Sequence, residues 1–265
     1  MTLMAPSPGV VASITERGFA VVRGTELRFP GLEDAWQKLT DDWMHLETDA
    51  YMADGGRYRL RRFGRFFFVP ATSELLRLPH ATVFQSRYVN NFAGGIHRNF
   101  APLRDATFEN PLLLALVRFD FSCFEVAEPA RLSAPWEVWI HQIRIRTDDD
   151  TAVLPAPEGI HHDGHDFIAM HLVKRQNVRG GRSTLYDNAK KEVHSCMLEN
   201  PLDTIYANDH QVMHAVEPIR PAVKGLPAER DILIIDFDHR PGLARTDRGH
   251  NGTGEPGDGA ALSNH

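Results

Sequence analysis

The sequence predicts a mainly β fold, a jelly roll with α-helices packed on it from the N-terminal side. From residue 136 onward, short segments rich in β-branched and aromatic residues follow one another, separated by turn signals such as Gly180-Gly181. Short strands with closely spaced turns are typical of a sandwich or barrel, whereas a parallel sheet needs a crossover between strands. Before residue 136, apolar residues at helical spacing predict helices as well.

The first half of the chain combines helical and extended segments. Apolar residues between 32 and 46 recur at helical spacing, which predicts one amphipathic helix there. Residues 58–69 form an extended, aromatic segment. A second helix is expected to begin at Asn110-Pro111 and to run to about residue 125, because asparagine caps a helix and proline suits its first turn.

The second half of the chain is predicted to consist of strands. In the first of them, Trp139, His141, Ile143 and Ile145 share one parity, while polar residues occupy the other. This alternation predicts a strand that is buried on one face only. Further strands are expected at residues 166–174, 183–186, 204–207, 211–216 and 231–237.

No composition change divides the chain of 265 residues before its last segment. We therefore expect one domain over residues 11–240, with a helical and extended part at 11–135 and a jelly-roll core at 136–240. Residues 241–265 are rich in glycine, aspartate, asparagine and arginine and nearly free of large apolar residues. This segment is expected to be a disordered tail.

Composition and charge argue against several classes of function. Hydrophobic residues make up 42% and charged residues 24% of a chain with net charge −6, so neither a nucleic acid nor a membrane surface is an expected partner. No apolar run is long enough to span a membrane, and the N-terminus lacks the features of a signal peptide. The two cysteines form no CxxC pair, which favours a reducing, cytoplasmic location. The sequence leaves open whether the protein is a monomer or a homo-oligomer.

A His-x-Asp motif is the most informative feature of the sequence. His161 and Asp163 stand two residues apart, so on an extended strand they point to the same face and can bind one ion. His214, on a later strand, is placed to supply the third ligand. Two histidines and one carboxylate are the facial triad of non-haem Fe(II) oxygenases. His162 and His165 are weaker alternatives, because His162 has the wrong parity and His165 follows a glycine turn.

Arg230 extends this motif. It begins the apolar run that ends at Phe237 and that predicts a buried strand. A guanidinium there can hold a dicarboxylate by a two-pronged contact. Iron, a dicarboxylate and oxygen together indicate a 2-oxoglutarate-dependent dioxygenase.

The chain also resembles a known family in several motifs. They are Pro157-Glu158-Gly159-Ile160-His161-His162-Asp163-Gly164, residues 175–181 with Tyr186-Asp187, residues 208–219, and the upstream segments 58–63 and 85–90. In these motifs the chain is similar to the bacterial 2-oxoglutarate/Fe(II)-dependent amino-acid hydroxylases of the isoleucine dioxygenase type. The likeness extends from about residue 55 to 238.

The resemblance implies a double-stranded β-helix of the cupin-like type. It implies Fe(II) bound by His161, Asp163 and His214, with 2-oxoglutarate held by Arg230. It further implies that O2 is used to hydroxylate an unactivated C–H bond of a free amino acid or close derivative, while 2-oxoglutarate is converted to succinate and CO2. A carrier-bound amino acid as substrate and a non-oxidative cupin-like metalloenzyme are the alternatives.

Four further residues are candidates for contacts with a small-molecule substrate: Arg59, Tyr88, Asn90 and His162. Arg59 belongs to a basic stretch, residues 57–65, in which a solvated strand face is the simpler expectation. His162 departs from the neutral polar residue expected between the two ligands. His141 is expected to be a hydrogen-bonded core residue, with a role in a pocket as the alternative.

Overall fold

A large antiparallel sheet organises the structure, a computed structural model that describes residues 5–87, 92, 94–126, 129–147 and 151–240. The predicted tail, residues 241–265, lies outside this range. The sheet's strand order is β1-β12-β8-β15-β7-β3-β2, with β4 paired to β3. The strands are β1 (Phe19–Val22), β2 (Glu47–Thr48), β3 (Arg59–Val69), β4 (Glu74–Arg77), β7 (Trp136–Thr147), β8 (Phe167–Gln176), β12 (Thr204–Asn208) and β15 (Ala228–His239).

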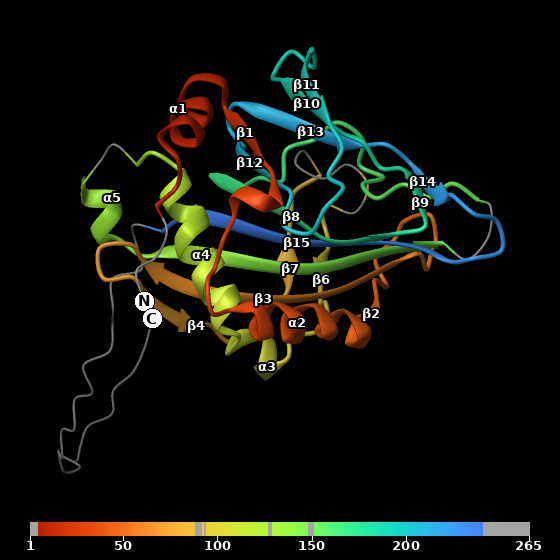
Figure 1. The fold of residues 1–265 in the computed structure, drawn as a ribbon, viewed down its shortest axis with the longest axis horizontal. Helices are drawn as coiled ribbons and strands as arrows, with labels where there is room; N and C mark the ends of the chain where they lie inside the picture. The colour runs from red at the N-terminus through yellow and green to blue at the C-terminus, as the bar shows by residue number, and fades with distance from the viewer. Residues whose placement is uncertain (1–4, 88–91, 93, 127–128, 148–150, 241–265) are drawn as a thin grey trace, which may run out of the picture.

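Smaller sheets accompany this large sheet, and Figure 1 shows β10, β11 and β13 above it, on the side of β12 and β8. One has the order β11-β10-β13, a second pairs β14 with β9, and a third pairs β5 with β6. Together the sheets confirm the predicted mainly β jelly roll. The strands are β5 (Val83–Phe84), β6 (His97–Arg98), β9 (Val178–Gly180), β10 (Ser183–Asp187), β11 (Glu192–Cys196), β13 (Val212–Val216) and β14 (Ile219–Pro221).

Helices from the N-terminal half lie along the large sheet (Figure 1). They are α1 (Pro8–Arg17), η1 (Gly24–Glu26), α2 (Glu33–Asp41), η2 (Asp42–His45), α3 (Asp105–Phe108), α4 (Pro111–Cys123) and α5 (Pro129–Ser133). None of the helices in the described ranges is long and apolar enough to cross a membrane.

The predicted helix at Asn110 is confirmed as α4. The Asn110 side chain accepts hydrogen bonds from the backbone N–H groups of Leu112 and Leu113, at 2.9 and 3.2 Å. The helix predicted over residues 32–46 is instead the α-helix α2 followed by the 3-10 turn η2. Asp42, where the α-helix ends, is buried and pairs with Arg104 at 2.8 Å, so a tertiary contact coincides with the change of helix type.

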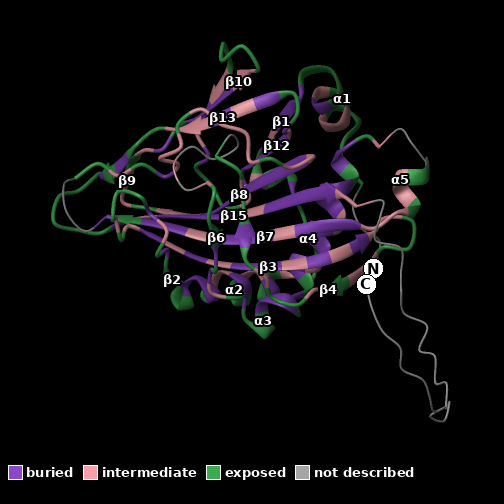
Figure 2. Cartoon of the chain, turned by 180° about the vertical axis from the view of Figure 1, so that it is seen from behind, coloured by how far each residue is buried: buried purple, intermediate pink, exposed green. Residues whose placement is uncertain are grey.

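The prediction that β7 is buried on one face only is wrong. Its first face packs Trp136, Val138 and Ile140 into the core beside α4. Its second face, with His141, Ile143 and Ile145, is also largely buried and lines a cavity. Figure 2 shows the resulting buried stretches along the central strands β7 and β15. The polar parity of β7 misled the prediction because Gln142 and Arg144 are buried too, at 0% and 6% exposure.

Candidate active site

A cavity of about 140 Å³ opens over one face of the large sheet. Its floor is made by alternate residues of β7 and β15, and its other walls include β13, the segment around residue 160, and the β5–β6 pair. Most of the site residues predicted from the sequence lie here. The cavity is lined by Arg59, His161, His162, Asp163, His214 and Arg230, among others.

His161, Asp163 and His214 come together at this cavity. Their candidate ligand atoms all lie within 4.8 Å of one another. The Nε2 atom of His161 is 3.2 Å from Oδ1 of Asp163, and the Nε2 atom of His214 is 3.6 Å from Oδ2 of the same carboxylate. The sequence therefore predicted which three side chains converge, and no other cluster of at least three potential ligands is found among the described residues.

The backbone around His161 explains this convergence. His161 and His214 exchange two backbone hydrogen bonds, of 3.0 and 3.1 Å, as an isolated antiparallel bridge. After His161 the strand pairing ends, and the chain bends at Gly164, whose φ is +88°. His161 and Asp163 therefore do not belong to one paired strand, although the two side chains still meet.

Asp209 fixes the bend after His161, a role that the sequence did not reveal. Its carboxylate accepts the backbone N–H groups of Asp163, Gly164 and His165, at 3.2, 2.7 and 3.0 Å. Asp209 is only 3% exposed. Carboxylates that gather consecutive backbone N–H groups hold a turn rigidly, so Asp209 sets the position of the Asp163 side chain.

The donor atoms of the cluster fit a divalent transition metal. His161 Nδ1 lies 2.9 Å from the carbonyl oxygen of Gly159, to which it donates as the Nδ1–H tautomer, leaving the Nε2 lone pair for a metal. Two imidazoles and one carboxylate are the donor set of non-haem Fe(II) sites.

Electrostatics in the cluster favour an ionised Asp163. Burial opposes ionisation, but His214 and His161 outweigh it and lower the pKa of Asp163. Burial likewise opposes the charged form of His161, yet the hydrogen bond and charge of Asp163 raise the pKa of His161 to about 9. The carboxylate thus stabilises a nearby positive charge, which a metal ion would supply in place of a proton.

Arg230 lies in the same cavity and is only 5% exposed. Its Nε has no hydrogen-bond partner among the described residues. Burial and the charge of Arg175 lower the pKa of Arg230 to about 10. A buried guanidinium with an unused donor and a neighbouring like charge fits a site for an anionic ligand.

Gly181, in the predicted Gly180-Gly181 turn, packs beside Ile219 and Arg175. Its φ is +76°, and a Cβ there would lie 2.9 Å from the Ile219 side chain and 3.2 Å from Nη1 of Arg175. A larger residue would strain the turn and press on both neighbours. Glycine is therefore required here by the turn and by its close packing.

The predicted substrate-contact residues have different surroundings. Arg59 faces the cavity but already contacts Asp49 at 2.8 Å and Glu158 at 3.7 Å. His162 also faces the cavity, with its Nδ1 3.6 Å from Asp209, and does not join the three-residue cluster. Tyr88 and Asn90 lie outside the described residues. The substrate roles of all four residues remain predictions.

Two expectations about neighbouring residues are wrong. The basic stretch of β3 is not a solvated face, because Arg59 and Arg61 are 5% and 8% exposed and face the cavity. His141 is buried as expected, but it lines the cavity rather than the core. Both errors have one cause, since the sequence does not reveal that β3 and β7 share a face that folds over a cavity.

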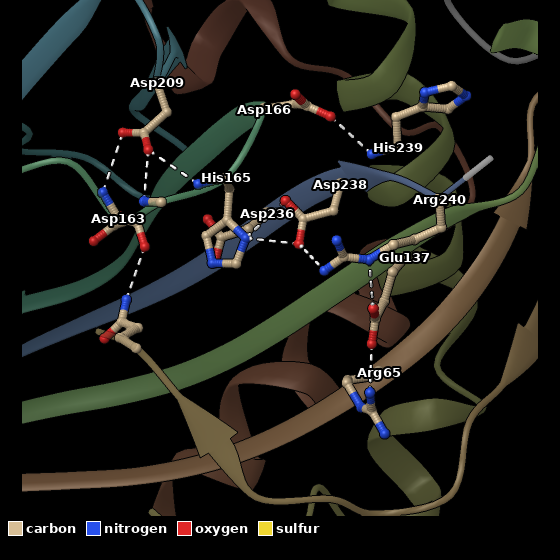
Figure 3. A network of polar contacts seen from close by, with 12 residues as sticks. Arg65, Glu137, Asp163, His165, Asp166, Asp209, Asp236, Asp238, His239 and Arg240 are labelled. Atoms are coloured by element: carbon tan, nitrogen blue, oxygen red, sulfur yellow. Dashed lines mark hydrogen bonds and ion pairs between the residues drawn. The ribbon is translucent and has the colours of Figure 1, made fainter. Parts of the chain in front are cut away.

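A chain of charged side chains leads from the cavity toward β7 and β3, as Figure 3 shows. His165 Nδ1 lies 3.1 Å from the Asp238 carboxylate, which also accepts from Arg240 Nη2 at 3.0 Å. Arg240 Nε in turn donates to Glu137 at 3.1 Å, and Glu137 pairs with Arg65. Asp236 and Asp238 both lie on β15, and of these two carboxylates Asp236 lines the cavity.

Comparisons with known proteins agree with this geometry. The model of the family described as 2OG-Fe dioxygenase matches residues 40–236. A curated relative from Bacillus thuringiensis, L-isoleucine-4-hydroxylase, is 28% identical over 200 residues, which cover 75% of this chain and 81% of that protein. A second, 3(1)-hydroxy-L-isoleucine 4-dioxygenase from Pantoea ananatis, is 27% identical over 154 residues, 58% of this chain and 62% of that protein.

Solved structures have the same fold. A BsmA homologue from Methylobium petroleophilum PM1 aligns with a TM-score of 0.73 and 29% identity, covering 87% of this chain and 92% of that one. The structure of IDO from Bacillus thuringiensis aligns with a TM-score of 0.73 and 22% identity, covering 88% of this chain and 98% of that one. The second likeness concerns the fold alone.

Proposed function

Because this chain belongs to the 2OG-Fe dioxygenase family, we propose that it hydroxylates an unactivated C–H bond of a free amino acid or close derivative. The enzyme uses Fe(II), 2-oxoglutarate and O2. The overall change is balanced: substrate, 2-oxoglutarate and O2 give hydroxylated substrate, succinate and CO2. The amino-acid substrate is supported by the names of the relatives from Bacillus thuringiensis and Pantoea ananatis.

One observation carries this proposal, namely that a His-Asp-His cluster and an anion-accepting arginine line the same cavity. In the proposed assignment, His161, Asp163 and His214 hold Fe(II), and Arg230 holds the distal carboxylate of 2-oxoglutarate. When bound, iron with 2-oxoglutarate and O2 supplies the oxidising power of the reaction.

The residues of the chain contribute position and environment to the reaction. Gly159 holds the imidazole of His161 as the Nδ1–H tautomer, and Asp209 holds the turn that carries Asp163. Arg230 orients the co-substrate by pairing with one carboxylate at its far end. The apolar side chains of Ile143 and Ile232, which face the cavity, keep water away from the reacting groups.

The proposal includes a cytoplasmic location and one domain over residues 11–240. A reducing compartment keeps iron ferrous and suits Cys123 and Cys196, which are both free thiols and buried.

Succinate formation is the direct test of the proposed activity. The purified protein is loaded with Fe(II) and 2-oxoglutarate without oxygen, oxygen is admitted, and succinate is measured across a panel of free L-amino acids. Succinate that rises with one amino acid, together with a product heavier by one oxygen atom, is the expected result. Binding of Fe(II) without any oxygen uptake or succinate would contradict it and favour a non-oxidative metalloenzyme.

A further inference from the structure

The end of the cavity away from Arg230 carries charged side chains that the proposed iron and 2-oxoglutarate sites do not use. Arg230, Ile232, Ile234 and Asp236 are alternate residues of β15, and all four face the cavity. Arg230 and Asp236 therefore lie about 20 Å apart along this strand. One end of the strand offers a positive group to the cavity and the other end offers a carboxylate.

Asp236 is a buried carboxylate with unused bonding capacity. The residue is 2% exposed, and its Oδ1 has no hydrogen-bond partner among the described residues. Its Oδ2 lies 3.6 Å from Nε2 of His141 and 3.8 Å from Nε2 of His165, which are both beyond hydrogen-bond distance. A buried carboxylate in this state is costly unless a ligand brings a positive group with N–H donors.

His165 places positive charge near Asp236 at 3.8 Å but makes its hydrogen bond elsewhere. Its Nδ1 lies 3.1 Å from Asp238, so its closer acidic partner is the carboxylate outside the cavity lining. Figure 3 shows His165 between the two carboxylates of β15.

Two arginine side chains that line the same cavity, Arg98 and Arg61, have few acidic partners. Arg98 is 3% exposed and donates from its guanidinium to the amide oxygen of Gln85, while its Nε has no partner within the part of the chain that the structure describes. No carboxylate among the described residues lies within ion-pair distance of Arg98. Arg61 shares the single carboxylate of Asp49 with Arg59 and lies at the longer distance, 3.7 Å against 2.8 Å.

Arg61 and Arg98 both contact the ring of Phe100. Their guanidinium carbons are 3.8 and 5.3 Å from the centre of the Phe100 ring. Burial and the charges of Arg59 and Arg98 outweigh the attraction of Asp49 and Glu158 and lower the pKa of Arg61 to about 9. Three buried arginines, Arg59, Arg61 and Arg98, thus share the carboxylates of Asp49 and Glu158. The guanidinium groups of Arg61 and Arg98 therefore have donors that suit a carboxylate from a ligand.

The imidazole of His141 lies between the guanidinium of Arg61 and the carboxylate of Asp236. Nη2 of Arg61 donates to Nδ1 of His141 at 2.7 Å, and Nε2 of the same ring faces Asp236 at 3.6 Å. One imidazole ring therefore separates a guanidinium from a carboxylate. An α-amino acid carries its carboxylate and its ammonium on one carbon. When it lies beside this ring, its carboxylate can contact the guanidinium of Arg61 while its ammonium contacts the carboxylate of Asp236.

We propose that Arg61 and Arg98 bind the carboxylate, and Asp236 the ammonium, of a single zwitterionic substrate, a free α-amino acid. This assignment rests on the proposed function and makes its substrate class specific. A carrier-bound amino acid is excluded by it, because a carboxyl group held as a thioester or amide has no charge to offer the arginines. An N-acylated amino acid is excluded as well, because its nitrogen is not an ammonium.

The first test compares three forms of one ligand. The twenty standard L-amino acids are screened on the protein loaded with Fe(II) and 2-oxoglutarate, by thermal shift without oxygen and by succinate after oxygen is admitted. The amino acid with the strongest response is then compared with its primary amide and its N-acetyl derivative by calorimetry without oxygen. Each derivative is expected to bind at least about 30-fold more weakly, because it leaves a buried charge unpaired.

Separate variants test the proposed carboxylate contact and the proposed ammonium contact. Arg98→Gln should weaken binding of the free amino acid and remove most of the preference for the acid over the amide. Asp236→Asn should remove most of the preference for the free amine over the N-acetyl form. Asp238→Asn is the matched control, since this carboxylate shares His165 with Asp236 but does not line the cavity. The control should keep both preferences, and all three variants should bind 2-oxoglutarate as the unmodified protein does.

Three results would overturn the subsite. They are equal binding of the acid, amide and N-acetyl forms, preferences that survive in both cavity variants, and a screen in which no amino acid binds although 2-oxoglutarate is bound and slowly consumed. All three leave the proposed iron chemistry intact. Failure to bind or consume 2-oxoglutarate would instead contradict the proposed function, and the calorimetric comparison of the three ligand forms would still decide the subsite.

Discussion

Replacing Arg230 by methionine should change stability and co-substrate binding in opposite directions. The guanidinium is 5% exposed, and its pKa is lowered from its ordinary value to about 10 by burial and by Arg175. A shift of this size means that the folded state disfavours the charged side chain by about 3 kcal/mol at neutral pH. Methionine fills a similar volume without a charge. The unliganded protein should therefore gain about 1–3 kcal/mol in its free energy of unfolding.

Binding of 2-oxoglutarate should suffer in the same variant. With the anion bound, the buried guanidinium gains the partner that it lacks, and removing one member of such a pair costs about 2–5 kcal/mol. The affinity for 2-oxoglutarate should fall at least about 30-fold, while the affinity for Fe(II) stays within about threefold. Urea denaturation of the metal-free protein gives the first quantity, and calorimetric titration without oxygen gives the second.

Arg144 provides the matched control for this experiment. It is 6% exposed on β7, the strand next to β15, but it makes two hydrogen bonds of 2.7 Å to the carboxylate of Asp231. Arg144→Met should lower the free energy of unfolding by about 3–5 kcal/mol, because it leaves Asp231 buried and unpaired. If Arg230→Met destabilises the unliganded protein as strongly as Arg144→Met does, Arg230 has a structural role and the anion-site assignment is refuted.

Three further predictions concern the metal cluster, the turn beside it and a distant carboxylate. His161→Ala and Asp163→Ala should each abolish substrate-dependent succinate formation and Fe(II) binding in a metal titration, and full activity in Asp163→Ala would rule out the ligand set. Asp209→Ala should lower Fe(II) affinity about 10–100-fold in the same titration, because the backbone N–H groups of Asp163, Gly164 and His165 lose their acceptor; unchanged affinity would contradict that role. For Asp203, burial opposes ionisation, but the N–H groups of Gly24, Glu199 and Asn200 lower its folded-state pKa. The ionised carboxylate therefore stabilises the folded protein above about pH 4, and this stabilisation is lost as the pH falls through the lowered pKa. In urea denaturation, Asp203→Asn should lower the free energy of unfolding by about 1–3 kcal/mol at pH 7 and by much less near pH 3. An equal loss at both pH values would contradict this pH dependence.

The parts of the site that the sequence predicted are those encoded by local spacing. His161 and Asp163 are two residues apart, and His214 and Arg230 lie in or at the start of segments whose apolar pattern identifies strands. The match of the family to residues 40–236 confirms the resemblance found in the same motifs. The core strands and the capped helix α4 were predictable for a similar reason, since each has a repeating or terminal signal of its own.

The missed parts depend on contacts between distant segments. The role of Asp209 could not be predicted from the sequence, because its backbone partners lie 44 to 46 positions away in the chain. Helix α1 was missed despite Pro8 at its first position, since it buries only Ile14 and has a weak apolar pattern. Proline in a first turn is compatible with a helix, but without a clear apolar pattern after it this signal does not predict one.

The charged end of the cavity shows why a strand pattern alone cannot define a substrate site. Arg61 is predictable as a strand residue and Asp236 as the interruption of an apolar run, and each looks ordinary in its own segment. Only the register places them together: Arg61 pairs with Ile143 across β3 and β7, Ile234 pairs with His141 across β15 and β7, and Asp236 follows Ile234 on the same face. That register sets a buried guanidinium and a buried carboxylate on either side of one imidazole. Asp236 makes no hydrogen bond to its histidine neighbours and Arg61 shares Asp49 with Arg59. The proposed selection of a zwitterion therefore depends on the arrangement of the sheet and not on a single residue.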